Sequence, residues 1–221
     1  SCWFCMASPN FEGYLVASVG DESYVCLAKG PLTPHHALVL PIQHRSSSLD
    51  LMPDEAKEVE SYLSALRRCF AKRGQHVVIF ERFMCNSQFE HMHLQVVPLP
   101  PALPDTTASA FKSHGAKLGI TFEVLSTGTS LASRLPNKEP FFRVELPDGS
   151  QLLHRMSTNT RKHPLQFGRQ VIASMLGTPH LADWKLCLPK PALGQSVTER
   201  DLEEQLASDF KAAFAEFDPT V

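Results

Sequence analysis

The chain has 221 residues, of which 43% are hydrophobic and 20% charged, and its formal net charge is −2 at pH 7. This length accommodates one large domain or two small ones with a substantial core. The net charge is near zero, so the composition does not indicate a nucleic-acid-binding protein. No apolar run approaches the length of a membrane span.

The cysteines indicate the compartment. Six of them are spread unevenly, at positions 2, 5, 26, 69, 85 and 187. This is not the disulfide framework of a small secreted protein, so we expect a reduced intracellular environment with most cysteines as small core residues. The chain opens directly on Cys2-Trp3-Phe4-Cys5 without the pattern of a signal peptide, so we expect domains upstream of Ser1.

The first third of the chain predicts short strands. Residues 14–19 and 23–28 form a predicted hairpin around Gly20-Asp21, and residues 36–41 a short buried strand. Residues 76–81 predict a further strand.

Residues 53–73 form the clearest predicted helix. Pro53 suits a first turn, and the two acidic residues that follow favour the N-terminal end of the helix dipole. An apolar stripe at spacings of three and four predicts the buried face: Ala56, Val59, Leu63, Leu66 and Phe70. Basic residues load the last turns before Gly74: Arg67, Arg68, Lys72 and Arg73. A solvated face matched to the dipole explains them most simply, and phosphate binding is the alternative.

The proline-dense residues 98–104 predict a domain boundary, with domains at 1–104 and 105–221. Beyond it we expect helices at 105–117, 167–176 and 198–214, the last capped by Thr198. Strands are expected at 120–125, 141–146 and 151–156, the last two around the turn Pro147-Asp148-Gly149, with a polar loop at 127–140.

Residues 90–98, with the sequence EHMHLQVVP, predict a central strand. Side chains alternate across a strand, so His91, His93 and Gln95 share one face, each about 7 Å from the next. An imidazole can act as a nucleophile, an acid or base, or a metal ligand, and a glutamine beside it can donate to a phosphoryl oxygen. The simpler alternative is an edge strand with a solvated polar face.

Cys2 and Cys5 form a C-x-x-C pair, which can supply half of a tetrahedral zinc site. The other ligands must come from distant residues, and the candidates are His44 and His91. Alternatively, the two cysteines are packed thiols or a redox pair, although the thioredoxin-like βαβ context of a redox motif is not predicted here.

In its order of motifs the chain resembles the histidine-triad superfamily, and by its H-x-H-x-Q most of all the galactose-1-phosphate uridylyltransferase branch. More closely, it resembles the C-terminal region of CwfJ-like proteins over essentially all 221 residues. The segments that carry this resemblance include CWFC, HALVLPIQH, HLQVVPLP, FFRVELPDGSQLLHR, PLQFGRQVIAS and DFKAAFAEFDP.

The resemblance implies an α+β fold, with a histidine-triad-like antiparallel sheet and a long helix, plus a second, smaller α+β half. It also implies a structural Zn²⁺ held by Cys2, Cys5, His44 and His91. His93 matches the nucleophile that attacks the α-phosphorus of a nucleotide, and Gln95 matches a residue that contacts the phosphoryl oxygen. By analogy with histidine-triad dimers, we expect a monomer whose second half takes the place of the missing partner.

A second basic stretch runs from His154 to His163 and contains no acidic residue. Its arginine and lysine side chains suit RNA phosphates, and the candidates are Arg155, Arg161, Lys162 and, beyond the stretch, Arg169. The alternative is a solvated hairpin end and helix start.

Two functions follow as hypotheses. The first is an RNA-processing module of the nucleus, with a cytoplasmic pool left open, that binds RNA phosphates next to the spliceosome and the lariat debranching enzyme. The second is an active nucleotidyl hydrolase or transferase that uses His93. Members of the resembling family act in these assemblies, and none of this requires a membrane.

Overall fold

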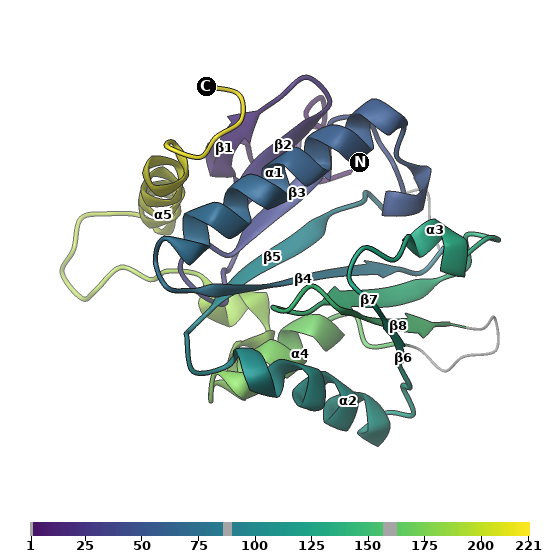
Figure 1. Ribbon diagram of the computed structural model, residues 1–221. Coiled ribbons are helices and arrows are strands. Elements are labelled where there is room, and N and C mark those ends of the chain that lie inside the picture. The colour runs from purple at the N-terminus through teal and green to yellow at the C-terminus, as the bar shows by residue number, and fades with distance from the viewer. Residues whose placement is uncertain (1, 86–89, 157–162) are drawn as a thin grey trace.

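One antiparallel sheet runs through the part of the chain that the structure, a computed structural model, describes: residues 2–85, 90–156 and 163–221 (Figure 1). Its strands are β1 (Val16–Val19), β2 (Ser23–Leu27), β3 (Ala37–Pro41), β4 (His76–Phe83), β5 (Leu94–Leu99), β6 (Glu123–Leu125), β7 (Phe141–Glu145) and β8 (Gln151–Arg155). Their order across the sheet is β1-β2-β3-β5-β4-β7-β8-β6, and every neighbouring pair is antiparallel. The expected antiparallel α+β fold is confirmed.

Five α-helices accompany this sheet within the described residues. They are α1 (Pro53–Ala71), α2 (Thr107–Lys117), α3 (Leu131–Arg134), α4 (Phe167–Met175) and α5 (Glu199–Phe214). The short α3 lies within residues 127–140. The prediction of a loop over this segment is therefore partly wrong. Two short 3₁₀ turns, η4 (Pro179–Ala182) and η5 (Trp184–Cys187), follow α4.

The predicted hairpins form, but the central strand is shorter than expected. β5 begins at Leu94, so His91 and His93 precede it rather than lying within it. The prediction that they share a strand face with Gln95 is therefore wrong for the histidines. Their positions are determined by contacts outside the ladder, described below.

α1 forms where the sequence predicts it and ends two residues before the predicted limit. The Glu55 carboxylate accepts a hydrogen bond from the Met52 N–H at 2.7 Å, which satisfies a donor at the helix start. Val59, Leu63, Leu66 and Phe70 are buried against the sheet, whereas Ala56 is exposed. The stripe therefore begins one turn later than the sequence indicates.

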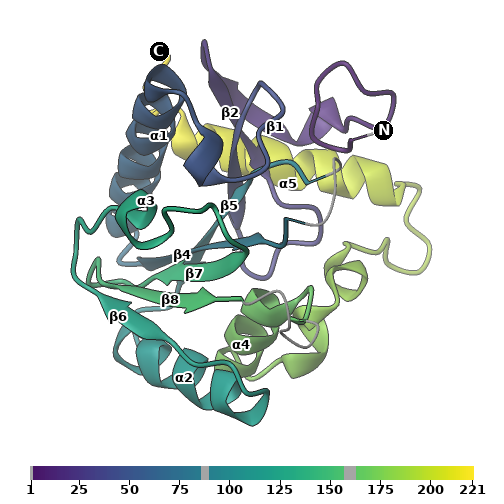
Figure 2. The ribbon, with the colours of Figure 1, turned by 90° about the vertical axis from the view of Figure 1, so that its right-hand side faces the viewer.

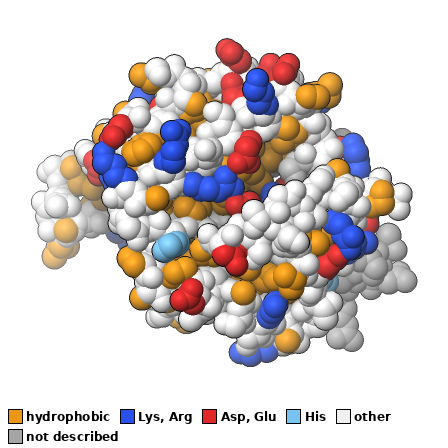
Figure 3. All heavy atoms as spheres, viewed as in Figure 1, with side chains coloured by type: hydrophobic (Ala, Val, Ile, Leu, Met, Phe, Trp, Pro, Cys, Tyr) orange, Lys and Arg blue, Asp and Glu red, His pale blue; other side chains and the backbone are white. Residues whose placement is uncertain are grey.

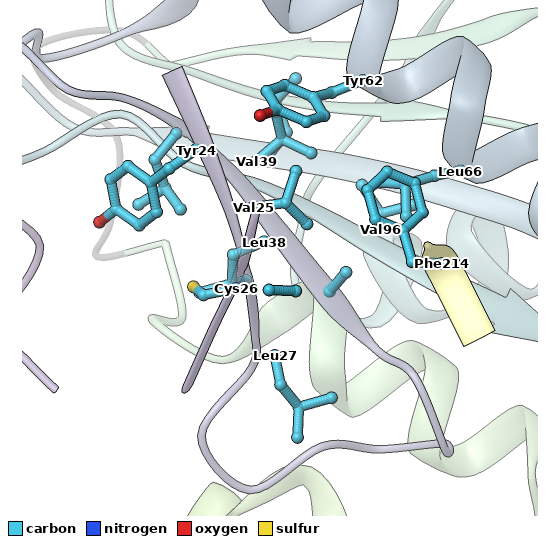
Figure 4. Close-up of a cluster of buried hydrophobic side chains, with 14 of the residues drawn as sticks. Tyr24, Val25, Cys26, Leu27, Leu38, Val39, Tyr62, Leu66, Val96 and Phe214 are labelled. Atoms are coloured by element: carbon cyan, nitrogen blue, oxygen red, sulfur yellow. The ribbon is translucent and has the colours of Figure 1, made fainter. Parts of the chain in front are cut away.

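The last helix returns to the first part of the chain. Ala207, Phe210 and Phe214 of α5 are buried in the same core as α1 and strands β1, β2 and β3. Figure 4 shows Phe214 in this cluster with Leu66 of α1. Both ribbon views place α5 beside β1 and β2 (Figures 1 and 2). Residues separated by almost the whole chain thus form one core.

We expect Phe210→Ala to destabilise the whole protein, because Phe210 is fully buried between α5 and the sheet. Truncating a buried phenylalanine to alanine typically costs about 3–5 kcal/mol of unfolding free energy. Urea unfolding measures this loss. The exposed Ser208→Ala on the same helix is the control, and equal midpoints for the two variants would show that α5 does not contribute to this core.

A second core covers the opposite face of the sheet. Phe111 of α2 and Phe167 of α4 pack on Phe142 of β7, with ring centroids 6.1 and 5.0 Å away. β4 belongs to both parts, because it pairs with β5 on one side and with β7 on the other. The predicted division at residue 104 is therefore not marked by a break in the sheet.

Candidate functional site

Two cysteines and two histidines meet at one end of β3 and β5. Because these strands are antiparallel neighbours, the C-terminal end of β3 lies beside the start of β5. His44 follows β3 by three residues and His91 precedes β5 by three, so both histidines lie at this end of the strands. The N-terminal segment brings Cys2 and Cys5 to them, and the Tyr24 hydroxyl donates to the Phe4 carbonyl between the cysteines at 2.8 Å.

The four side chains fit a single tetrahedral metal ion. Their ligand atoms all lie within 4.8 Å of one another. Cys5 Sγ is 3.3 Å from His44 Nδ1 and 3.5 Å from His91 Nδ1, and Cys2 Sγ is 3.5 Å from His91 Nδ1. Metal bonds of 2.3 Å to sulfur and 2.0–2.1 Å to nitrogen, at tetrahedral angles, require a separation of about 3.5 Å.

The hydrogen bond on the far side of the His91 ring supports this role. His91 Nε2 lies 2.9 Å from the Pro41 carbonyl, so Nε2 carries the proton and donates it. Nδ1 then keeps its lone pair and faces the cysteines, which is the arrangement that metal-bound histidines usually have. His91 is buried, and burial lowers its pKa to about 4, so the neutral ring that a metal needs is the stable form.

His93 lies next to this cluster and is held in one tautomer. Its Nδ1 is 2.9 Å from the carbonyl of His91, to which it donates, so Nε2 carries the lone pair. The Phe4 ring packs against the imidazole at 4.9 Å between centroids. Burial lowers the pKa of His93, which favours the neutral ring. The hydrogen bond to the backbone carbonyl keeps the proton on Nδ1. Nε2 then has the lone pair with which a histidine acts as a nucleophile.

Gln95 is oriented by His36, a residue whose role the sequence does not reveal. The Leu32 N–H donates to His36 Nδ1 at 3.1 Å, so the other nitrogen, Nε2, carries the proton. Nε2 lies 2.9 Å from Gln95 Oε1 and donates to it. The amide oxygen of Gln95 is therefore occupied, and its NH₂ group is left as the donor.

His93 and Gln95 line a cavity of about 720 Å³. This is within the range of roughly 300–1,000 Å³ typical of sites for small molecules and cofactors. One wall comes from the first part of the chain and includes Trp3, Phe11 and Tyr24. The other comes from the second part and includes Phe142, Gly168, Arg169 and Trp184. Neither part forms this cavity alone.

The predicted phosphate-binding residues do not gather in one described place. Arg155 pairs with the Glu123 carboxylate at 3.2 Å, an acidic partner that β6 brings alongside β8. Arg161 and Lys162 lie outside the described residues. Arg169 is only 4% exposed, and its guanidinium donates to the carbonyls of Gly30, Leu181 and Ala182 and to the Cys187 sulfur. These contacts through Nε and Nη2 make Arg169 a link between the two halves.

The basic end of α1 is also largely occupied. Arg67 pairs with Glu60 at 2.9 Å and Glu145 at 2.6 Å, and Lys72 pairs with Glu216. On the face shown in Figure 3, basic and acidic side chains are intermixed. The solvated, charge-paired explanation of this cluster therefore accounts for its contacts.

The fold and site define a class: an α+β protein in which a Cys₂His₂ cluster adjoins a cavity holding a histidine of fixed tautomer. The chain belongs to the family of proteins similar to the CwfJ C-terminus. A family model described as "Protein similar to CwfJ C-terminal" matches residues 1–112, and one described as "Protein similar to CwfJ C-terminus 2" matches residues 120–220. The resemblance seen in the sequence motifs is thereby confirmed.

Several curated relatives match over nearly the whole of this chain. "CWF19-like protein 1" of Xenopus laevis is 41% identical over 225 residues, which is 100% of this chain and 39% of that protein. The human protein of the same name is 37% identical, with the same coverage. "Zinc finger CCCH domain-containing protein 59" of Oryza sativa subsp. japonica is 38% identical over 99% of this chain and 35% of its own length. The chain thus spans less than two fifths of these relatives.

Solved structures with a similar arrangement include histidine-triad proteins. A zinc-bound histidine triad family protein from Mycobacterium smegmatis is 22% identical, with a TM-score of 0.36 over 47% of this chain and 78% of that one. A hypothetical histidine triad nucleotide-binding protein from Sulfolobus tokodaii is 20% identical, with a TM-score of 0.35 over 44% of this chain and 68% of that one. At these scores they carry no weight in the assignment, which depends on the family models.

None of the helices in the described residues has the length and apolar character that a membrane span requires.

Proposed function

We propose that this chain is a ligand-binding module of an RNA-processing factor, and that it takes a nucleotide phosphate or an RNA end into the cavity beside His93. Membership of the CwfJ family supports the RNA-processing context. Within it, we propose the nucleus as the location and the spliceosome and the lariat debranching enzyme as partners. The second half supplies a wall of the cavity, which supports a monomer as the working unit.

The observation that carries this proposal is the orientation of Gln95. His36 occupies the amide oxygen, so the NH₂ group is the part left to meet a ligand. An NH₂ donor beside a neutral imidazole suits a phosphoryl oxygen, whereas it offers nothing to a cation. The aromatic side chains Trp3, Phe11 and Tyr24 on the cavity wall suit the ring of a nucleobase.

The metal cluster has a structural role in this proposal. Sets of two cysteines and two histidines are typical of closed, structural zinc sites, and all four positions here come from the protein. Zinc would tie the N-terminal segment to the loop after β3 and to the segment that carries His93. It would then orient His93 without contacting the ligand.

We expect Gln95→Glu to weaken the binding of AMP by at least about tenfold, because it replaces a donor to the phosphate with a negative charge. Isothermal titration calorimetry of the unaltered and variant chains measures the change. Glu204→Gln, an exposed carboxylate on α5 outside the cavity, is the control. If the unaltered chain binds neither AMP nor a 5′-phosphorylated oligoribonucleotide, the proposed binding function is wrong.

A longer RNA should also engage the basic stretch near Arg155. We expect Arg155, Arg161 and Lys162, changed together to alanine, to weaken binding of a single-stranded RNA and to reduce its salt dependence, because phosphate contacts release counterions. Fluorescence anisotropy at several salt concentrations tests this. Unchanged affinity would remove the stretch from the binding surface.

A second candidate function is nucleotidyl transfer, and the fixed tautomer of His93 favours it. The Nε2 lone pair would attack the α-phosphorus and form a phosphorus–nitrogen bond, while the leaving group departs with the electrons of its own bond to phosphorus. The Gln95 NH₂ group would stabilise the charge on the phosphoryl oxygen. Water would then break the phosphorus–nitrogen bond and restore the imidazole.

A further inference from the structure

Arg82 is an arginine in the wall of the cavity, and no acidic residue in the described part of the chain forms an ion pair with it. It lies near the end of β4 and lines the same space as His93 and Gln95. No carboxylate of the described residues lies within ion-pair distance of its guanidinium, in contrast to Arg45, Arg67 and Arg143. Neither composition nor motif points to Arg82, which lies in the mostly apolar strand β4 directly after Glu81.

His163 of the second half holds this guanidinium in place. Arg82 Nε donates to His163 Nδ1 at 3.1 Å, and Nη2 donates to the His163 carbonyl at 2.7 Å. A guanidinium has five N–H donors, so these two bonds leave three, on Nη1 and Nη2. His163 is buried, and its Nε2 has no hydrogen-bond partner among the described residues. An unpaired buried N–H costs free energy, and the ring has this N–H in the tautomer whose Nδ1 accepts from Arg82.

The strand register places Arg82 on the face of the sheet that carries Gln95. Phe80 of β4 is paired with Gln95 of β5, and side chains of directly paired residues lie on the same face. Arg82 lies two residues beyond Phe80 in β4 and therefore on the same face of that strand. Arg82, His93 and Gln95 all line the cavity.

The charge of Arg82 indicates what the cavity accepts. Burial lowers the pKa of Arg82, which means that the surroundings penalise its charged form. Glu90 also lines the cavity, and its charge raises the pKa of Arg82 by less than burial lowers it. Arg169 shows the alternative, because several carbonyls and a sulfur accept from its guanidinium. A half-buried guanidinium with free donors and no counterion favours an anionic ligand.

We propose that Arg82 binds a second phosphate of the ligand, next to the phosphate that faces His93 and Gln95, and that His163 is the residue that positions Arg82. This inference rests on the proposed nucleotide-binding function. It defines the ligand class as nucleotides with two neighbouring phosphates, whether in a diphosphate chain or in consecutive links of an RNA strand. A free guanidinium end can hold such a phosphate through two parallel hydrogen bonds.

The test compares three probes: AMP, ADP and the 5′-phosphorylated dinucleotide pApA. We expect the unaltered chain to bind ADP or pApA at least about tenfold more tightly than AMP, and the better of the two identifies the source of the second phosphate. Arg82→Gln should abolish this preference and leave the AMP affinity nearly unchanged. Arg200→Gln removes the same charge from an exposed, ion-paired position outside the cavity and should keep the preference.

Two His163 variants test the positioning role. His163→Phe keeps an aromatic ring against Phe142 but removes the acceptor for Arg82 Nε, so the preference should fall. His163→Asn supplies an oxygen near the position of Nδ1 and should restore it in part. A purely structural role would change stability, measured by thermal unfolding, without changing the ratio of ADP to AMP affinity.

The outcomes separate the two proposals. If none of the three probes binds to the unaltered chain, the binding function is wrong and the inference falls with it. If all bind but ADP and pApA bind no better than AMP, or if Arg82→Gln keeps the preference, the role of Arg82 is wrong while the binding function stands.

Discussion

The variant Cys5→Ser should unfold at a temperature more than about 10 °C below that of the unaltered chain, and a strong chelator should produce the same loss. Cys5 Sγ lies within 3.5 Å of both histidine ligand atoms, so serine breaks the four-ligand set. A structural zinc ion contributes about 10–16 kcal/mol to folding in zinc-finger peptides, which is as large as the whole stability of most domains. Each kcal/mol shifts the midpoint of a chain of this size by about 2–4 °C.

Calorimetry and metal analysis together test this prediction. Freshly purified chain that has not met a chelator should contain one zinc ion per molecule by mass spectrometry. Cys85→Ser is the matched control, since Cys85 is an exposed cysteine outside the cluster and should change neither value. A chain without stoichiometric metal, whose midpoint does not respond to chelation, would refute the zinc site.

The second large effect concerns His93. If the chain is a nucleotidyl transferase or hydrolase, His93→Ala should reduce turnover at least about 10³-fold. Among the described residues that line the cavity, no other histidine has an Nε2 with a free lone pair. Adenylylated compounds and dinucleoside polyphosphates are the substrates to assay. Zinc content should stay the same, whereas His91→Ala should lose metal and fold poorly.

The pH profile gives an independent check on the nucleophile. Attack requires the neutral ring, and burial lowers the pKa of His93, so the ring stays neutral below the ordinary histidine value of about 6.5. The acid limb of the kcat/KM profile should therefore fall below pH 6.5. If the unaltered chain and His93→Ala are equally inert on all substrates, the enzyme hypothesis is wrong and the binding module remains.

Local sequence determined the elements whose signals are themselves local. The proline, acidic first turn and apolar stripe of α1 predict its start and its buried face to within a turn, because a helix depends mainly on residues three and four apart. Thr198 caps α5 as predicted, and its hydroxyl accepts from the Asp201 N–H at 3.1 Å. The hairpins around Gly20-Asp21 and Pro147-Asp148-Gly149 follow from turn chemistry in the same way.

The four candidate metal ligands could also be named from the sequence, where the C-x-x-C pair suggests half of a zinc site and the family resemblance implies the whole set. Only the tertiary structure shows that their ligand atoms converge. That convergence depends on β3 and β5 being neighbours, with residues 42 to 93 between them in the chain. Strand pairing over such a distance leaves no local periodicity in the sequence.

The residues that surround His93 and Gln95 in the fold were decided by tertiary structure alone. His36, Arg82 and His163 come from separate segments, and each acts through a hydrogen bond to a residue far away in the chain. The same holds for α5, whose amphipathic pattern predicts a buried face but not that this face covers the first three strands. A periodic pattern shows which side of an element is apolar, whereas the surface that buries it depends on how the whole chain packs.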